Sequence, residues 1–367
     1  GRAWHDFCDT LKTASSAISN GPPDALSQAE GYRYLARVTR AGLAAFLEYA
    51  DPDVPRLHSL IGDTIKMGAD NPDNLYESAP LLSAVTYKLK GLRGTVKYLS
   101  IGTQKGHYGK RLGMPPLSFL FVDSPHFQYF DEIPAEFVER YQIDKKSIDE
   151  NERYFEILIT RNECKPSDEE LKKRKLNWLR LDDQEDGTLI VRQTFGLREN
   201  EQKATIKLER FDMQRPDEAE EEEKRSETVE TRQMNRPKAL RPSQVEEALK
   251  SAASLVYGAG LMFSNWGNRM RNDKAGVNKL PVLEDQSAYK NAGGDPNIFY
   301  YHSYYEIARD EALVIKALIE EKCFFWNFQL NNHWMESLDY SHFPIHVNSE
   351  RAVYDRDEQS KQKCVFI

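Results

Sequence analysis

Apolar residues recur at three- and four-residue steps near the start of the chain, which is the period of an amphipathic helix. The pattern breaks at Pro22-Pro23, and Asp24 is then placed to cap a second helix through its carboxylate. The sequence therefore predicts an N-terminal helical region over residues 1–66. The apolar positions that define the first of these helices are Trp4, Phe7, Leu11 and Ile18.

From about residue 81 the apolar period changes from 3.6 to 2, the period of a β-strand. Asp186-Gly187 is typical of a hairpin turn, because glycine accepts a positive φ. Short strands at this spacing predict a first β-rich module over residues 67–212, of the sandwich or jelly-roll type. The alternating runs are 85–89, 96–101, 119–122, 154–160, 178–181, 189–195 and 204–210.

An acidic stretch then interrupts the pattern over residues 213–242. Six of the seven residues in 217–223 are acidic, and Pro216 and Pro237 lie on either side. Such a segment buries too little apolar surface to offset the entropy of ordering, so we expect a mobile linker. An acidic tract that binds a basic partner is the alternative.

The next segment, residues 243–272, has the clearest helical pattern of the chain. Ser243 and Glu246 have the spacing of a capping box, in which each side chain bonds a free backbone N–H group. A long apolar stripe follows and predicts one long connecting helix. Its residues are Val245, Leu249, Ala252, Val256, Ala259, Phe263, Trp266 and Met270.

After residue 295 the strand pattern returns, now rich in aromatic residues. The runs 298–305, 313–318 and 324–330 predict strands of a C-terminal jelly-roll-like module over residues 273–354, followed by a polar tail over 355–367. The predicted fold is thus α+β and mainly β. It has two β-sandwich or jelly-roll-like modules, N-terminal helices and one long connecting helix.

Composition narrows the classes of protein. The 367 residues carry a formal net charge of -8, which does not favour binding to nucleic acid, and no apolar run approaches the ~18 residues of a membrane span. Four scattered cysteines form neither a zinc ribbon nor a disulfide framework. We expect a cytoplasmic protein, with an N-terminus that is incomplete at Gly1. The end, Cys364-Val365-Phe366-Ile367, formally matches a prenylation box, and a cut through a longer chain is the favoured alternative.

Common catalytic signatures are missing from the sequence. It contains no Gly-x-Gly-x-x-Gly after a strand, no phosphate-binding loop, no His-Glu-x-x-His and no Gly-x-Ser-x-Gly, so we expect no cofactor. Strand-borne histidines bind metals in cupin-like jelly rolls, and this leaves a metal site as an alternative to histidines that pair with backbone or carboxylate groups. The weak metal candidates are His302, His333, His342 and His346.

Two segments of the chain resemble each other. Residues 70–76 and 295–301 each place an Asx-Pro pair just before an aromatic run. One interpretation is a pair of turns that lead into strands, since Asn and Asp side chains cap turns. The other is a polar rim with tyrosine platforms for a hydroxylated ligand, which would use Asp295, Asn297 and Tyr304.

The densest candidate site lies in residues 323–340, where amides and aromatic rings interleave before two carboxylates. Aromatic faces pack against the C–H patches of sugars, and amides and carboxylates bind sugar hydroxyls. Glycoside hydrolysis needs two carboxylates ~5–10 Å apart, and Glu336 and Asp339 are the catalytic candidates. The ligand-binding candidates here are Trp326, Asn327, Gln329, Asn331, His333, Trp334 and Tyr340.

The run 325–340 resembles the C-terminal hallmark of a bacterial family, domain of unknown function 1214. Residues 71–76 are similar to the strand-entry motif of its frequent N-terminal partner, domain of unknown function 1254. This resemblance implies a jelly-roll sandwich, a second β module and connecting helices, and it suggests carbohydrate handling only through fold analogy. The chain departs from that family after Val353, where further strand sequence is expected.

These observations favour a β-sandwich protein that interacts with a carbohydrate or polyol. Such a protein either binds the ligand alone or acts on a glycan as a hydrolase or lyase. A non-catalytic assembly or scaffold protein, which forms a homo-oligomer through its aromatic strands, is the first alternative. A metal-dependent jelly-roll enzyme is the second. Whether the protein is an enzyme is left open by the sequence.

Overall fold

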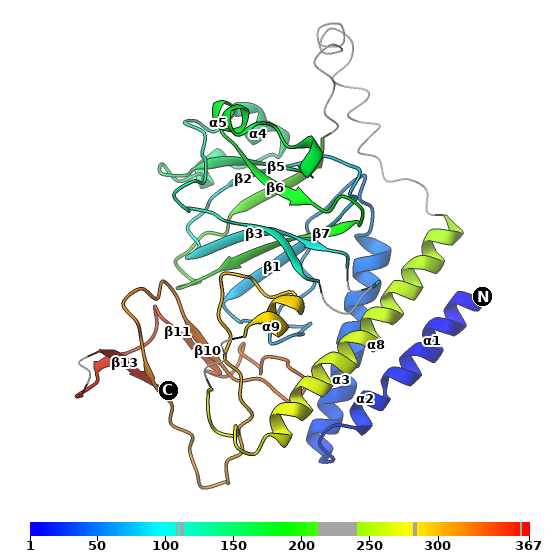
Figure 1. Cartoon of the computed structure of the whole chain (residues 1–367), viewed down its shortest axis with the longest axis vertical. Coiled ribbons are helices and arrows are strands. Elements are labelled where there is room, and N and C mark those ends of the chain that lie inside the picture. The colour runs from blue at the N-terminus through cyan, green and yellow to red at the C-terminus, as the bar shows by residue number, and fades with distance from the viewer. Residues whose placement is uncertain (108, 111–113, 212–240, 282–284, 360–361) are drawn as a thin grey trace, which may run out of the picture.

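The computed structural model describes residues 1–107, 109–110, 114–211, 241–281, 285–359 and 362–367. Three parts make up the molecule: a layer of helices, a β-sandwich and a C-terminal part with short strands (Figure 1). The predicted linker over 213–242 lies almost wholly outside the described residues. Among the described helices, none is both long and apolar enough to cross a membrane.

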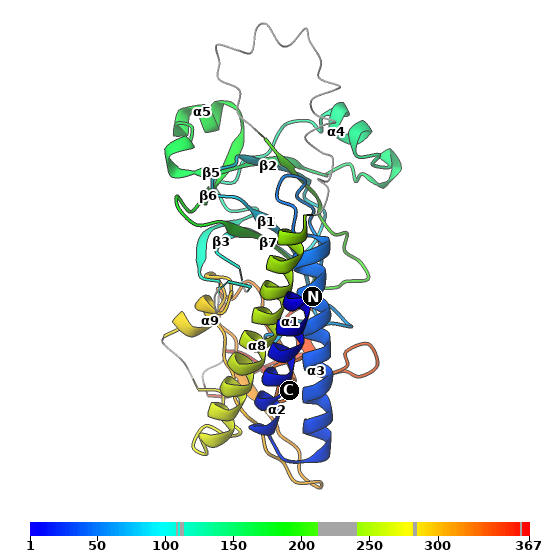
Figure 2. The same ribbon diagram turned by 90° about the vertical axis from the view of Figure 1, so that its right-hand side faces the viewer.

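The helix layer brings the N-terminal region against the long helix. Figure 2 shows α1 and α3 running beside α8. Asp24 caps α3 as predicted, because its carboxylate accepts a hydrogen bond from the Ser27 N–H at 2.9 Å. The helices are α1 (Arg2–Ala14), α2 (Ser16–Ser19), α3 (Ala25–Leu43) with a π-helical turn η1 (Ala44–Glu48), and α8 (Pro242–Asn272).

Helix α8 has the predicted length, but its predicted cap at Ser243 is wrong. The helix starts at Pro242, and the side chain of Gln244 accepts a hydrogen bond from the Arg241 N–H at 2.9 Å. Proline suits the first helical position because its φ is fixed near the helical value and its missing N–H would have had no partner there. This shifts the cap by two residues.

The predicted first β-rich module is a sandwich of two four-stranded sheets, with strand orders β1-β7-β3-β4 and β6-β5-β2-β8. All pairs are antiparallel except β5 and β6, which are parallel and are joined through α5 (Asp168–Lys173). The strands are β1 (Asn74–Leu81), β2 (Tyr87–Leu92), β3 (Tyr98–Lys105), β4 (Pro116–Phe121), β5 (Tyr154–Arg161), β6 (Leu176–Leu181), β7 (Gly187–Thr194) and β8 (Thr205–Arg210). The connections include α4 (Ala135–Arg140), η2 (Lys145–Ser147) and η3 (Asn162–Cys164).

The hairpin predicted at Asp186-Gly187 is wrong. Strands β6 and β7 belong to different sheets, so the turn between them crosses the sandwich. The Asp186 carboxylate accepts a hydrogen bond from the Ser83 N–H at 2.9 Å and thereby fixes this crossing. Turn residues report a change of direction and do not specify the strand that will be paired.

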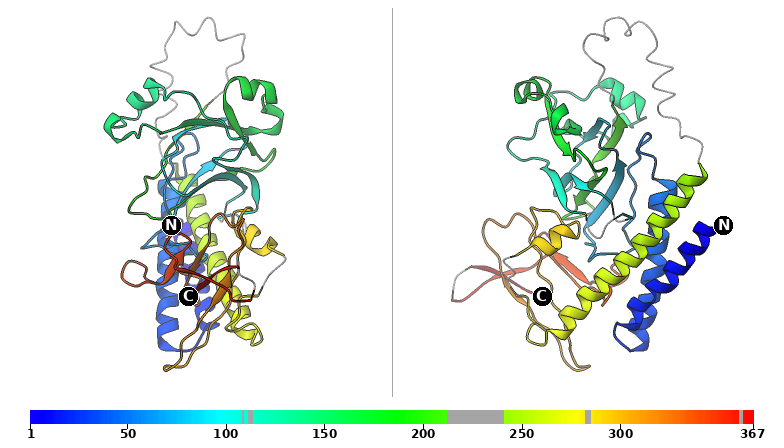
Figure 3. Two further views of the ribbon diagram at one scale, coloured as in Figure 1. Left: turned by 90° about the vertical axis from the view of Figure 1, so that its left-hand side faces the viewer. Right: turned by 45° about the vertical axis from the view of Figure 1, so that its right-hand side comes forward.

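The two faces of the sheet β1-β7-β3-β4 differ in chemistry. Leu189 and Val191 of β7 lie in the apolar core between the sheets. Arg192 points to the opposite face, where the register places it between Tyr76 of β1 and Ser100 of β3. We call this the polar sheet face. The segment that carries α9 (Ser287–Asn291) lies against it (Figure 3, left).

The C-terminal part is less regular than predicted. Of the predicted strands, 313–318 and 324–330 each keep three strand residues, and 298–305 keeps none. In residues 298–305 a side chain takes the place of a neighbouring strand, because Gln286 bonds both the N–H and the carbonyl of Tyr300. The strands are β9 (Lys316–Leu318), β10 (Asn327–Gln329), β11 (His346–Asn348), β12 (Tyr354–Arg356) and β13 (Lys363–Phe366).

These strands form a two-stranded sheet, β10-β11, and a three-stranded sheet, β12-β13-β9. The mixed α+β fold is therefore confirmed, with thirteen strands in the described part of the chain. A jelly roll in the C-terminal part stays a prediction.

Candidate functional site

The aromatic and amide motif of residues 326–340 divides between two environments. Trp334 has no exposed surface, and its indole N–H donates a hydrogen bond to the Ser27 carbonyl at 2.9 Å. Its ring fills the space beside Gly21 and Gly31, where an added Cβ would lie 2.5–2.6 Å from it. Trp334 thus belongs to the core of the helix layer.

The two predicted catalytic carboxylates have unlike surroundings. Glu336 is fully buried, with one oxygen 2.7 Å from Arg37 Nη1 of α3 and the other accepting a hydrogen bond from Asn332 at 2.8 Å. Asp339 is exposed and lies 2.8 Å from His342 Nδ1. That hydrogen bond lowers the pKa of Asp339. One oxygen of Glu336 thus joins the motif to α3, and the other holds Asn332 within the motif.

The motif also forms hydrogen bonds with residues 66–70. Both the N–H and the hydroxyl of Ser337 donate to the Asp70 carboxylate, at 3.1 and 2.7 Å, while Lys66 donates to the Ser337 carbonyl at 3.0 Å. Desolvation raises the pKa of Asp70 to about 6. Gln329 donates to the Asp70 carbonyl at 2.9 Å, so the motif binds backbone as well as side chains of this loop.

The remaining polar residues of the motif bond mostly within it. Asn327 donates to the Gln329 side chain at 3.3 Å, and Gln329 donates to Asn331 at 2.9 Å. The Lys66 ammonium lies 4.2 Å from the centre of the Tyr340 ring. Desolvation raises the pKa of Tyr340 to about 12.

The four histidines lie in separate surroundings. His333 is 7% exposed, packs edge-on against Trp334 and Tyr304, and has no hydrogen-bond partner for either ring nitrogen among the described residues. Burial lowers its pKa, and that of His302 beside Trp266, to about 4.

His346 pairs with Asp73 at 3.2 Å, and His342 is exposed beside Asp339. No group of three or more histidine, cysteine or acidic residues in the described ranges could hold a metal ion.

The two similar Asx-Pro segments fold into the same turn. Asn71 accepts a hydrogen bond from the N–H two residues later at 2.8 Å, and Asp295 does the same from Asn297 at 2.9 Å. In each, the tyrosine five residues on accepts the N–H of the first residue, at 3.1 Å for Tyr76 and 3.2 Å for Tyr300. Both segments therefore form the predicted turn, but the predicted strand follows only the first turn, as β1, and the prediction of a strand after the second is wrong.

The second turn is held on the polar sheet face. Asp295 is fully buried and accepts hydrogen bonds from Ser100 at 2.5 Å and from Tyr98 at 3.2 Å, and Arg192 Nη1 lies 3.9 Å away. Asn297 is exposed. The carbonyl of Gly293 accepts hydrogen bonds from Arg192 and from Gln104.

Arg192, Tyr98 and Ser100 were not among the residues predicted from the sequence. The sequence did contain one signal for this site, because the predicted strand 189–195 carries an arginine on its outward side. A charge within a sheet needs a partner, so this arginine indicates a buried polar contact. Three buried polar atoms on this face have no hydrogen-bond partner among the described residues: Arg192 Nη1, Asn74 Oδ1 and Gln104 Oε1.

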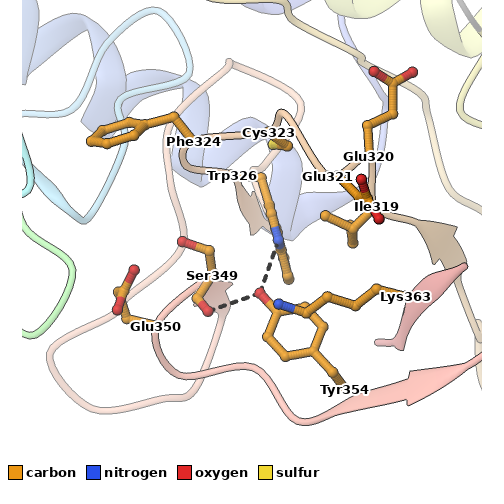
Figure 4. A pocket seen from close by; sticks show the side chains of 10 residues that line it. All are labelled: Ile319, Glu320, Glu321, Cys323, Phe324, Trp326, Ser349, Glu350, Tyr354 and Lys363. Atoms are coloured by element: carbon orange, nitrogen blue, oxygen red, sulfur yellow. Dashed lines mark hydrogen bonds between the residues drawn. The ribbon is translucent and has the colours of Figure 1, made fainter.

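Trp326, at the other end of the motif, lies on a pocket with a cavity volume of ~190 Å³ (Figure 4). Its indole N–H donates to the Tyr354 hydroxyl at 3.1 Å, and that hydroxyl donates to the Ser349 carbonyl at 2.8 Å. We call this cavity the Trp326 pocket. Three glutamates and Lys363 also line it. The pocket includes Trp326 and leaves out Glu336, Asp339, Asp295 and Tyr304, so the predicted site residues do not converge on it.

Comparison with protein-family models gives no match, and comparison with curated proteins gives none either. Among solved structures, that of an uncharacterized protein from Burkholderia cenocepacia is similar, with a TM-score of 0.77 and 37% sequence identity. The similarity covers 100% of this chain and 85% of that one. The chain belongs to the same family as the Burkholderia protein.

Proposed function

We propose that this protein binds a small hydroxylated molecule, a saccharide or polyol, in the Trp326 pocket. The observation that supports the proposal is a cavity in which an indole and a phenol stand together with carboxylates. Aromatic rings offer apolar faces to C–H groups, and carboxylates accept hydrogen bonds from hydroxyls.

The size of the pocket limits the ligand. Pockets for drug-sized molecules measure about 300–1,000 Å³. A cavity of ~190 Å³ is smaller, so the proposed ligand has the size of a single sugar ring or a short polyol. Neighbouring residues of a longer glycan would lie outside the cavity.

A hydrolase or lyase activity receives less support than binding does. The two oxygens of Glu336 are occupied by Arg37 and Asn332, and Asp339 pairs with His342 at the surface. If the family catalyses a reaction on a glycan, we expect its acid and base among the carboxylates of the pocket. The proposed relationship to domain of unknown function 1214 also leads us to expect carbohydrate handling.

Binding can be tested with saturation-transfer NMR and calorimetry on a panel of monosaccharides and polyols. We expect Trp326→Ala to abolish the signal of any ligand found with the wild-type chain. Trp4→Ala is the matched control, because Trp4 is exposed on α1, outside the pocket. A panel without a single binder would refute the proposal, as would a binder that Trp326→Ala leaves unaffected.

One observation favours the assembly alternative as a second function. Large apolar side chains are exposed repeatedly in the C-terminal part, including Phe299 (66%), Val314 (69%) and Val353 (88%). Exposed apolar side chains mark an interaction surface where they form one contiguous patch, and this second function requires that these residues do. We expect sedimentation equilibrium to show concentration-dependent association that Phe299→Ser with Val314→Ser weakens. A chain that stays monomeric at millimolar concentration would refute this second function.

A further inference from the structure

We propose that residues 299–307 form an open strand edge on which a second copy of this chain docks, so that the two copies pair as antiparallel strands about Ser303. The proposal rests on the assembly function above, and it names the partner and the contact. Three features support it: an extended backbone, a free edge and the order of the side chains. The chain after α9 reaches the end of the molecule opposite α4 and α5 (Figure 1).

Residues 298–308 are extended although they belong to no sheet of the described structure. None of them has a positive φ. Exposure alternates at the start of the segment, where Phe299 and Tyr301 are exposed between half-buried neighbours. This alternation is that of a strand with one face in solvent.

The two edges of this extended segment differ. On one edge, side chains bond the groups that a neighbouring strand would bond: Gln286 bonds Tyr300, and Asn278 bonds the N–H and the carbonyl of Glu306 at 2.9 and 2.7 Å. On the other edge, the backbone groups of the odd-numbered residues 299–307 have no hydrogen-bond partner among the described residues. A free edge of this kind is a template for a strand of another chain.

The segment with the free edge also carries exposed apolar side chains. Phe299, Tyr301, Tyr305 and Ile307 expose between 37% and 66% of their surface. All four have odd numbers, so in an extended chain they point to the same face. The segment therefore offers a docking strand both hydrogen-bonding groups and a row of apolar side chains.

The order of these residues fits a second copy of the same segment. In an antiparallel pair about a two-fold axis at Ser303, Phe299 of one copy lies opposite Ile307 of the other, and Tyr301 lies opposite Tyr305. Each exposed apolar residue thus gains an apolar partner, and within residues 297–309 no two like charges lie opposite each other. Aromatic and β-branched cross-strand pairs stabilise a sheet. A contact of this symmetry closes at two copies.

The pairing is tested by sedimentation equilibrium on two double variants that differ at one position. Tyr301→Lys with Tyr305→Lys places lysine opposite lysine in both cross-strand pairs, and Tyr301→Lys with Tyr305→Glu places lysine opposite glutamate. We expect a monomer–dimer equilibrium for the wild-type chain. The first variant should raise the Kd at least ~10-fold and the second should stay within ~3-fold of the wild type, because like charges destabilise a cross-strand pair and opposite charges stabilise it.

The control is Trp4→Lys with Tyr257→Lys, which adds the charge of the first variant at exposed aromatic residues of α1 and α8 and should leave the Kd unchanged. Urea denaturation of the dilute chains should give wild-type curves for all variants, since each replaced side chain is exposed. Amide hydrogen exchange of the wild type supplies an independent measurement. The N–H groups of Tyr301, Ser303 and Tyr305 should exchange more slowly in the dimer, because pairing bonds them.

Equal Kd values for the two tyrosine variants would overturn the pairing about Ser303 and keep the assembly function. Exchange of the three amides that is as fast in the dimer as in the monomer would do the same. Association beyond two copies would also overturn the pairing, because a two-fold contact closes. A chain that stays monomeric at millimolar concentration would overturn both the pairing and the assembly function.

Discussion

Trp326 and Trp334 belong to one continuous motif and have opposite roles in the structure. Trp334 is completely buried and bonds a backbone carbonyl in the first turn of α3, whereas Trp326 is half-buried, bonds a phenol and lines a cavity. The local sequence around each is equally rich in aromatic rings and amides. The difference comes from what packs on them, and it separates a residue that holds the fold together from one that is available to a ligand.

The largest effect that would test this comparison is expected for Trp334→Ala. Truncating a fully buried tryptophan costs about 4 kcal/mol of unfolding free energy, since it leaves a cavity beside Gly31. Trp326→Ala should cost less, about 2 kcal/mol, because Trp326 is only partly buried. Urea denaturation measures both. Equal losses for the two variants would break the comparison.

Glu336→Gln should have the next largest effect on stability. It removes the charge that faces Arg37, which is 20% exposed, and we expect a loss of about 2 kcal/mol. The double variant with Arg37→Met should recover part of it, since no unpaired charge remains. Asp339→Asn is the matched control at the surface and should leave the unfolding curve in place. A Glu336→Gln chain with wild-type stability and without ligand binding would instead assign Glu336 to the site.

The pH dependence of stability should contain two opposing contributions near Trp334. His333 has a pKa of about 4 in the folded chain and 6.5 when unfolded, so its contribution is full above pH 6.5 and is lost as the pH falls through this range. At pH 4.5 the loss is about 2 kcal/mol. His333→Phe should flatten this fall in urea titrations, because neither ring nitrogen has a partner to lose among the described residues.

Asp70 acts in the opposite direction. Its pKa rises from 3.8 to about 6 on folding, so the folded chain holds a proton that the unfolded chain has released between these values. Stability from this group therefore increases as the pH falls from 6 to 4. Asp70→Asn should remove this increase and make acid unfolding steeper. If the stability of this variant depended on pH as that of the wild type does, the result would contradict a raised pKa for the buried Asp70 carboxyl.

The smallest expected effect belongs to Tyr354→Phe in the pocket. Loss of the hydroxyl removes the partner of the Trp326 N–H and one bond to Ser349, at a cost of about 1 kcal/mol. Since Trp326 then loses its fixed orientation, we expect weaker ligand binding by calorimetry. A shift in Trp326 fluorescence with unchanged binding would show that orientation is unimportant.

Much of the sandwich was predictable, and much of the C-terminal part was not. The alternation that predicts 154–160 and 189–195 reflects a core between two sheets, and strands β5 and β7 lie there. Residues 298–305 have a similar aromatic pattern and form no strand, because Gln286 bonds the backbone that a neighbouring strand would have bonded. Periodicity reports which side of a segment is apolar and says nothing about whether a partner strand is present.

The candidate site shows the same limit. The aromatic and amide composition of residues 326–340 predicted a binding site there, and Trp326 does line a pocket. Glu336 is a carboxylate of the type that catalysis needs, yet it forms a salt bridge with Arg37 of α3. Arg192 was visible only as an outward residue in a strand, since its partner Asp295 lies about a hundred residues later in the chain.

The sequence by itself determined the elements whose driving force is local: the capped helix α3, the long helix α8, the strands of the sandwich and the two Asx-Pro turns, whose bonds span two to five residues. Only the tertiary structure decided which polar groups are buried in pairs and which line a cavity. Those outcomes depend on contacts between distant segments, such as Ser27 with Trp334 and Arg37 with Glu336. Desolvation makes these contacts decisive, because a polar group acquires its role from the partner that replaces water.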